Sequence, residues 1–161
     1  MKDLTNARFY RAKLVDTDKG TGVIDGDTIK NVHIAVRSFL YKLSDAPKEV
    51  FPGLVVDGNT LYRVANVQIA DIDAPERKPI TKDRSDESRE RERTAAEAAA
   101  NALDDMLSAN DYKFWVANPE EGSFGRIIAD VLVDSKSNVG ERLIGLGHAK
   151  PIGEGWDWDS D

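Results

Sequence analysis

Alternating hydrophobic and polar positions predict a series of short β-strands along the chain. The clearest alternation covers 61–71, where Ala65, Val67 and Ile69 share one face of an extended chain. The same reasoning predicts strands over 7–16, 21–30 (as strand, turn and strand), 32–41, 112–118 and 124–134. Short strands with few residues between them favour a small β-barrel.

Helical spacing appears later in the chain. Apolar residues recur on one helix face at Ala95, Ala99, Leu103, Met106 and Leu107. They predict a helix that begins within the charged stretch 77–94 and ends near Ala109. Asn138 with Glu141 three residues later has the form of a capping box, and predicts a short helix that Gly147 ends. With these helices added to the strands, the predicted class is α+β.

Two stretches follow neither periodicity. Residues 43–59 contain prolines and turn signals and predict a loop or small insertion, which Asp57-Gly58 turns back. The wider range 31–60 is interpreted as an extended hairpin or insertion. Residues 152–161 are acidic, contain two tryptophans and are expected to be disordered. The chain, 1–161, is predicted to form a single domain.

Composition narrows the chemistry. The 161 residues are enough for a real core, and the absence of cysteine excludes disulfides and thiolate metal sites. A net charge of −7 argues against a non-specific binder of nucleic acid, unless bound cations supply positive charge at a site. No run approaches the roughly 18 apolar residues of a membrane span, and the N-terminal segment is polar. We therefore expect a cytoplasmic protein with no membrane partner.

Candidate chemistry lies in three polar segments at predicted strand ends: Asp25-Gly26-Asp27-Thr28, 71–76 (DIDAPE) and Gly125-Arg126. Taken singly, they fit a turn, a solvated strand end and a surface arginine. If they meet in space, the carboxylates repel each other unless a cation lies among them, and oxygen ligands suit Ca²⁺ or Mg²⁺. A bound cation beside an arginine provides the groups needed for phosphodiester hydrolysis.

Other kinds of site fit less well. Zinc is disfavoured because the only imidazoles are His33 and His148. An EF-hand beginning at Asp134 fails because Val139 stands where the loop needs glycine. The chain also has no G-x-S-x-G nucleophile motif.

Taken in order, VIDGDTIK (23–30), VQIADIDAPE (67–76), the alanine-rich helix, FGRIIADVLVD (124–134) and NVGERLIGLGHAK (138–150) resemble the staphylococcal nuclease (thermonuclease-like) family. The resemblance spans roughly 8–150. It implies a five-stranded OB-type β-barrel with two to three packed helices. It also implies a Ca²⁺-dependent endonuclease activity that hydrolyses single- or double-stranded DNA, RNA or both.

The resemblance also assigns metal ligands. Asp27 and Asp73 would bind Ca²⁺ through their carboxylates, and the backbone carbonyl of Ala74 would be a third ligand. Asp25 would orient the turn from behind these ligands, and Thr28 would support the Ca²⁺ site.

By the same resemblance, Glu76 would position the attacking water as general base, and Arg126 would hold the scissile phosphate. The family's second phosphate-binding arginine lies five residues before the second aspartate, where this chain has Gln68. A neutral donor there could cost about 2–4 kcal/mol of transition-state stabilisation, or roughly 10²–10³ in rate. Lys30, also a candidate substrate contact, could restore the charge from a neighbouring strand.

Arg37 and Arg63 are further candidates for the missing charge, although Arg63 would have to cross to the opposite face of its strand. Three functions therefore stay open. The chain is an active nuclease, or a catalytically weakened OB-type module that binds nucleic acid or a protein partner, or a structural metal-binding domain. A protein partner could use the 31–60 insertion or the acidic tail.

Overall fold

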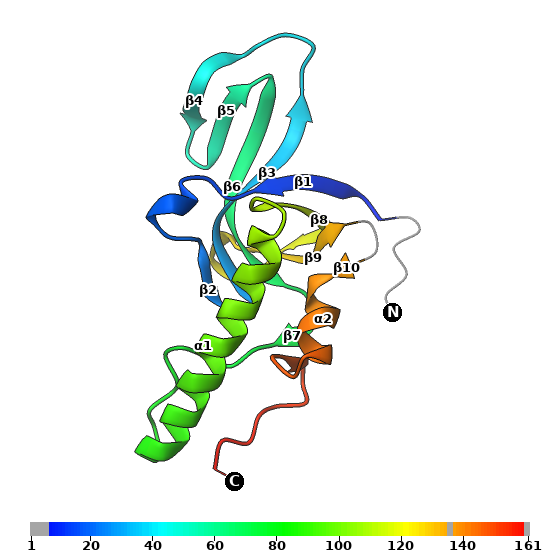
Figure 1. The fold of residues 1–161 in the computed structure, drawn as a ribbon. Coiled ribbons are helices and arrows are strands. Elements are labelled where there is room, and N and C mark those ends of the chain that lie inside the picture. Colours follow the sequence, from blue (N-terminus) through cyan, green and yellow to red (C-terminus); the bar gives the residue numbers. More distant parts are fainter. Residues whose placement is uncertain (1–6, 135–136, 160–161) are drawn as a thin grey trace.

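The computed structural model describes residues 7–134 and 137–159 (Figure 1). Its strands are β1 (Phe9–Lys13), β2 (Val23–Asp25), β3 (Thr28–Ser38), β4 (Ser44–Phe51), β5 (Leu54–Gly58), β6 (Thr60–Ile69), β7 (Ile72–Asp73), β8 (Lys113–Glu121), β9 (Ile127–Asp134), β10 (Ser137–Asn138) and β11 (Lys150–Pro151). The helices are α1 (Asp86–Ser108) and α2 (Val139–Gly145), with 3₁₀ turns η1 (Thr17–Lys19) and η2 (Ser123–Gly125). No helix in these ranges is long and apolar enough to cross a membrane.

Five of the described strands pair in a closed, barrel-like ring in the order β1, β3, β6, β9, β8 and back to β1. Neighbours are antiparallel except β6 and β9, which run parallel with Val67 level with Ile127. The α+β class and the five-stranded OB-type arrangement are thus confirmed. The two α-helices of the described chain fall within the predicted two to three.

The core fills the ring and the space beneath α1. Val67 and Ile69 are buried, as their alternation predicts, whereas the third member of that face, Ala65, is half-buried. Helix α1 begins after Ser85, whose hydroxyl accepts a hydrogen bond from the Ser88 N–H at 3.1 Å. The buried positions of α1 are Ser88, Glu92, Ala96, Ala99, Ala100, Leu103, Met106 and Leu107. The predicted stripe holds except at its start, because Ala96 replaces Ala95 on the buried face.

The first strands differ from their predicted bounds. The strand expected over 7–16 ends at Lys13, because the chain then turns through η1. Residues 28–38 form one continuous strand instead of two, since an irregularity between Ile29 and Val32 takes up the change in periodicity. The register of β3 on β6 therefore keeps both residues in the core, where each is fully buried.

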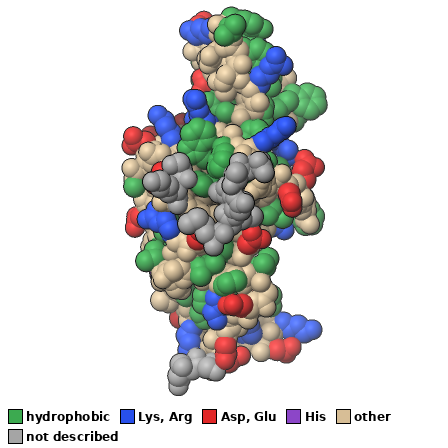
Figure 2. Space-filling model, turned by 90° about the vertical axis from the view of Figure 1, so that its right-hand side faces the viewer, with side chains coloured by type: hydrophobic (Ala, Val, Ile, Leu, Met, Phe, Trp, Pro, Cys, Tyr) green, Lys and Arg blue, Asp and Glu red, His purple; other side chains and the backbone are tan. Residues whose placement is uncertain are grey.

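The stretch 43–59 is not a loop. It forms the hairpin of β4 and β5, and β5 continues the sheet beside β6. Pro52-Gly53 makes the turn, with Gly53 at a φ of 79°, a conformation that favours glycine after proline. The hairpin projects from the ring as a narrow lobe (Figures 1 and 2). Its exposed hydrophobic side chains include Val50 and Phe51.

The C-terminal segment also differs from its prediction. Residues 152–159 run beside the N-terminal half of α1, where the Arg91 guanidinium donates to the Trp158 carbonyl at 2.6 Å. Trp156 and Trp158 stack with their centroids 5.0 Å apart. The Trp156 indole N–H donates to the Asp73 carbonyl at 3.3 Å. Backbone and ring contacts thus fix a segment whose composition suggested disorder; residues 160–161 lie outside the described chain.

Candidate active site

The turn between β2 and β3 places two carboxylates deep in the structure. Asp25 and Asp27 are 7% and 5% exposed, although both are acidic. Gly26 lies between them against α1, where an added Cβ would come within 2.8 Å of the Ala99 Cβ and 3.2 Å of the Ala74 Cβ. Only glycine lets the turn approach the helix this closely. Asp25-Gly26-Asp27 is therefore a tight turn that also buries two carboxylates.

Asp27 is held by its neighbour Thr28, by the end of β6 and by the residue that follows β7. Its carboxylate accepts hydrogen bonds from the Ala74 backbone N–H at 3.0 Å and from the Thr28 hydroxyl at 2.9 Å. Its own carbonyl accepts from the Ile69 N–H at 2.8 Å. The structure thus brings together the DGDT turn and the DIDAPE segment, as we expected. Thr28 supports Asp27 directly.

Asp73 and Ala74 follow at the end of β7. Strand β11 pairs with β7, with Lys150 level with Asp73. Ala74 is 1% exposed, and Pro75 beside it is also fully buried. Because the backbone is fixed on both sides, the Asp73 side chain and the Ala74 peptide are held beside Asp27.

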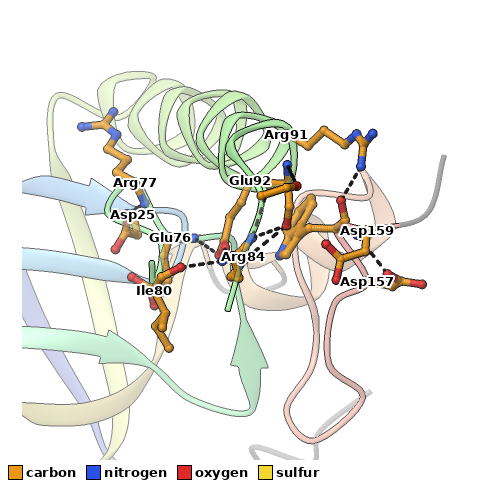
Figure 3. Close-up of polar contacts among 12 residues, drawn as sticks. Asp25, Glu76, Arg77, Ile80, Arg84, Arg91, Glu92, Asp157 and Asp159 are labelled. Atoms are coloured by element: carbon orange, nitrogen blue, oxygen red, sulfur yellow. Dashed lines mark hydrogen bonds and ion pairs between the residues drawn. The ribbon is translucent and has the colours of Figure 1, made fainter. Parts of the chain in front are cut away.

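Glu76 is positioned through its backbone. Its N–H donates to the Glu92 carboxylate at 2.9 Å, and the next N–H, of Arg77, donates to Asp25 at 3.0 Å. The other oxygen of Glu92 accepts from Arg84 at 2.6 Å, in an ion pair whose side chains are only 18% and 9% exposed. Figure 3 shows this chain of contacts running from the Asp25 turn to α1.

Arg84 is committed to this structural role. Besides Glu92, its guanidinium donates to the Ser88 hydroxyl at 3.0 and 3.2 Å and to the Ser88 carbonyl at 3.3 Å. It therefore joins the loop before α1 to the first turns of the helix. Because Glu92 neutralises its charge, Arg84 does not balance the negative charges of Asp27, Asp73 and Glu76.

Burial, and after it the charges of neighbouring carboxylates, raise the pKa values of three acids in the site. Partial burial of the carboxyl group, a hydrogen bond with Asp25 and the charges of Asp25, Asp27 and Glu92 raise the pKa of Glu76 from 4.5 to about 7. Burial raises the pKa of Asp27, although hydrogen bonds from Ala74 and Thr28 work against the shift. Burial and the charge of Glu92 raise the pKa of Asp73. Such crowding of like charges is typical of a site that holds a proton or a cation.

A pocket of about 360 Å³ opens beside these groups. Asp73, Ala74 and Glu76 lie on one side, and Trp156 to Asp159 of the C-terminal segment lie on the other. Lys150 lies 4.8 Å above the Trp156 ring, so a cation and an aromatic face also border this region. The pocket is open to solvent at the carboxylates, which suits a polar substrate.

The resemblance expects positions 68 and 126 to contact the phosphate, and these positions lie on β6 and at the end of the η2 turn. Gln68 is half-buried and level with Thr28 in the β3–β6 register and with Ile128 in the β6–β9 register. Arg126 ends the η2 turn just before β9, and its backbone bonds to Gly122 and Ser123. Within residues 7–134 and 137–159, the Arg126 side chain makes no ion pair with a site carboxylate.

The other proposed substitutes for the missing arginine make their described contacts with other residues. Lys30 is exposed and its N–H bonds to the Gly22 carbonyl. Arg63 pairs with Glu121 at 3.1 Å, and Arg37 lies 4.9 Å from the centre of the Phe39 ring. Gln68 is thus the side chain at the position where the resemblance expects an arginine.

Two carboxylates and a carbonyl fit a hard divalent cation. Across the described chain, no three acidic or histidine side chains gather closely enough to hold a metal by themselves. Ca²⁺ commonly completes its shell with carbonyls and water. Asp27 keeps unused lone pairs beyond its two hydrogen bonds, and the Asp73 charge lies near enough to raise its pKa. The donor set therefore fits Ca²⁺ with Asp27, Asp73 and the Ala74 carbonyl as protein ligands.

The family model described as staphylococcal nuclease homologue matches residues 66–154. This match covers more than half of the chain, and it contains Gln68, the DIDAPE segment, α1, Arg126 and both β11 residues. The protein belongs to the staphylococcal nuclease homologue family. It is accordingly a nuclease-like, nucleic-acid-binding module. A search among curated proteins returned no match.

Sequence reasoning missed the support of Glu76. Arg84 and Glu92 fall in the charged stretch 77–94, for which only the start of a helix was predicted. The four-residue spacing of Ser88 and Glu92 could have indicated a shared helix face, whereas Arg84 lies in the loop before the helix. Trp156 gave no such signal, because its contact with Asp73 spans 83 residues.

Proposed function

We propose that the protein is a Ca²⁺-dependent nuclease that hydrolyses phosphodiesters of DNA, RNA or both. The observation that carries this proposal is the meeting of three carboxylates: Asp27 accepts from the Ala74 N–H beside Asp73, and Glu76, with its backbone fixed by Glu92, borders the same pocket as Asp73. In the metal-free protein the pKa of Glu76 is raised to about 7. A general base works best when its pKa lies near the working pH. The cytoplasmic location stays a prediction.

The side chains divide the work. Asp27, Asp73 and the Ala74 carbonyl would hold the cation, which supplies positive charge to the phosphoryl oxygens when bound. Glu76 accepts a proton from water as general base. Arg126, at the end of the η2 turn, is proposed to hold the phosphate. Asp25 orients the loop through the Arg77 N–H.

The test is a gel assay with single-stranded DNA and RNA in Ca²⁺, in Mg²⁺ and in EDTA. Wild type should cut only with a divalent cation, and Glu76→Gln should lower the rate by about 10²–10⁴. The variant keeps the size of the side chain, so the backbone bond to Glu92 should persist. Equal cutting by wild type and Glu76→Gln, or cutting that survives EDTA, would exclude this mechanism.

A second candidate function rests on Gln68. Without the arginine, the same ring would bind nucleic acid or a protein and hydrolyse little. This function predicts binding that survives both EDTA and Glu76→Gln, with no cutting by the wild type. Loss of all binding on removal of the cation would argue against it.

A further inference from the structure

A second pocket lies on the outer surface of the ring, away from the acidic site. Its volume is about 540 Å³, within the range of small-ligand sites. It is lined by Arg11 and Lys13 of β1, Lys113 and Trp115 of β8, and Tyr62 of β6. We refer to these five residues as the basic–aromatic pocket.

The strand register explains why these side chains meet. Ala12 and Phe114 point into the core and are 4% and 2% exposed. Their neighbours along β1 and β8 therefore point outward, with Arg11 level with Trp115 and Lys13 level with Lys113. Cation and ring are thus set side by side across two paired strands.

The charges of this pocket are incompletely balanced. Lys13 pairs with Asp57 at 3.1 Å and lies 4.6 Å from the centre of the Tyr62 ring. Arg11 lies 5.8 Å from the centre of the Trp115 ring. Within the described residues, neither Arg11 nor Lys113 pairs with a carboxylate. Two lysines directly opposite on neighbouring strands repel each other, which an anionic ligand would relieve.

Tyr62 of the pocket shares a face of β6 with Gln68, the position at which the family resemblance expects an arginine. Tyr62 and Gln68 are six residues apart on the regular strand β6 and so face the same side, about 20 Å from each other at roughly 3.3 Å per residue. Both lie opposite the buried face that carries Val67 and Ile69. A polymer that contacts position 68 can therefore continue along this face to the pocket.

We propose that the basic–aromatic pocket binds single-stranded nucleic acid, with a base stacked on Trp115 and phosphates bound by Arg11 and Lys113. Cations beside exposed rings are the combination that binds single strands without reading their sequence. In a chain of net charge −7, this pocket supplies positive charge that the acidic site lacks. The inference rests on the proposed function only in assuming that one nucleic-acid strand contacts both sites. Binding at the pocket can be tested without hydrolysis.

The test measures fluorescence anisotropy of a labelled oligothymidylate of about 12 nucleotides, in EDTA so that the probe is not cut. Trp115→Ala should raise Kd about tenfold, and Trp115→Phe should recover most of the affinity. Arg11→Gln and Lys113→Gln should each raise Kd and lower the slope of log Kd against log salt by about 0.7. Lys48→Gln on the projecting hairpin makes the same charge change on the exposed strand β4 and is the matched control.

Pocket variants that bind like Lys48→Gln would overturn the inference, as would a wild type that does not bind the probe. Thermal unfolding of Trp115→Ala checks folding, and Lys113→Gln tests the site independently of the core. A labelled oligoglutamate that binds in place of the oligothymidylate, with the same dependence on Lys113, would reject nucleic acid in favour of an acidic protein. Hydrolysis of bis(p-nitrophenyl) phosphate, which fills only the acidic site, reports on the proposed function separately.

Discussion

The acidic site and the basic–aromatic pocket differ in construction. In the acidic site, Asp25 and Asp27 are buried, and backbone N–H groups hold their carboxylates. In the pocket, Trp115 is 36% exposed and the cations project from strands into solvent. Groups that carry out chemistry need fixed positions and perturbed pKa values, whereas groups that hold a flexible polymer need reach and charge.

Charge explains why the two regions cannot be one. A phosphate approaching only Asp27, Asp73 and Glu76 would meet repulsion, since Arg84 is already neutralised by Glu92. A cation bound at the acidic site would remove part of this repulsion. The basic–aromatic pocket would attract the other phosphates of the same nucleic-acid strand. In the proposed function, the acidic site therefore carries out catalysis and the basic–aromatic pocket binds the nucleic acid, so a substitution in one region should leave the other unchanged.

The largest expected effect restores a charge to the acidic site. Gln68→Arg should raise the rate of phosphodiester cleavage by up to about 10²–10³, because a guanidinium stabilises charge on the transferred phosphoryl group. Initial rates with Ca²⁺ measure the change. Anisotropy in EDTA should show a much smaller change in affinity, because the pocket itself is untouched.

Asn66→Arg provides the matched control for this variant. It places the same charge on the same face of β6, two residues from Gln68. If both variants raise the rate equally, a general gain of positive charge explains the effect and position 68 has no special role. If neither does, the site does not use an arginine at this place.

The next effect concerns the support of Glu76. Glu92→Ala leaves Arg84 buried without its partner and should lower the free energy of unfolding by about 3 kcal/mol. It also releases the Glu76 N–H, so the rate should fall in molecules that remain folded. Urea unfolding and initial rates measure the two effects, and oligothymidylate binding at the basic–aromatic pocket should persist.

Glu90→Ala is the comparison for Glu92→Ala. Glu90 pairs with Arg93 at 2.9 Å on the exposed face of α1, so its loss should cost at most about 0.5 kcal/mol. A similar loss of stability in both variants would show that Glu92 is an ordinary helix charge. Glu92→Gln, which keeps an acceptor for the Glu76 N–H, should recover part of the activity.

The smallest effect is a pH dependence that belongs to the acidic site alone. Glu76 binds its proton more tightly when folded, with a pKa of about 7 against 4.5, so the metal-free protein loses stability as the pH rises through this range. Because Glu76 is exposed and screened by solvent, we expect a loss of about 1 kcal/mol. The raised pKa values of Asp27 and Asp73 act in the same direction.

Urea unfolding in EDTA at several pH values between 4.5 and 7 measures this dependence. Glu76→Gln should flatten the curve, because the amide does not titrate. A wild type whose stability rises across this range would contradict the crowding of carboxylates on which the site rests. Variants of the basic–aromatic pocket should leave the slope unchanged.

Local pattern explains which features the sequence could predict. Val67 and Ile69 alternate with polar neighbours, and this alternation alone indicated their burial. Asp25-Gly26-Asp27 and Asp73-Ala74-Pro75-Glu76 could be recognised as strand ends with spare carboxylates. The range 31–60 was interpreted as an extended hairpin or insertion, but strands β4 and β5 were missed because the prolines of 43–59 suggested a loop. Pro52-Gly53 only turns the chain between these two strands, and β5 pairs with β6. A periodicity test cannot distinguish these cases without the neighbouring strand.

The sequence by itself determined the order of the elements, the apolar faces and the identity of the acidic groups, because these depend on near neighbours in the chain. Tertiary structure decided which groups act together. Glu92 reaches Glu76 across 16 residues, and Trp156 reaches Asp73 across 83, only because α1 and the C-terminal segment pack beside β7. The register of the closed ring likewise aligned Lys13 with Lys113. Such distant pairings follow from how the whole core is filled, which no short stretch of sequence specifies.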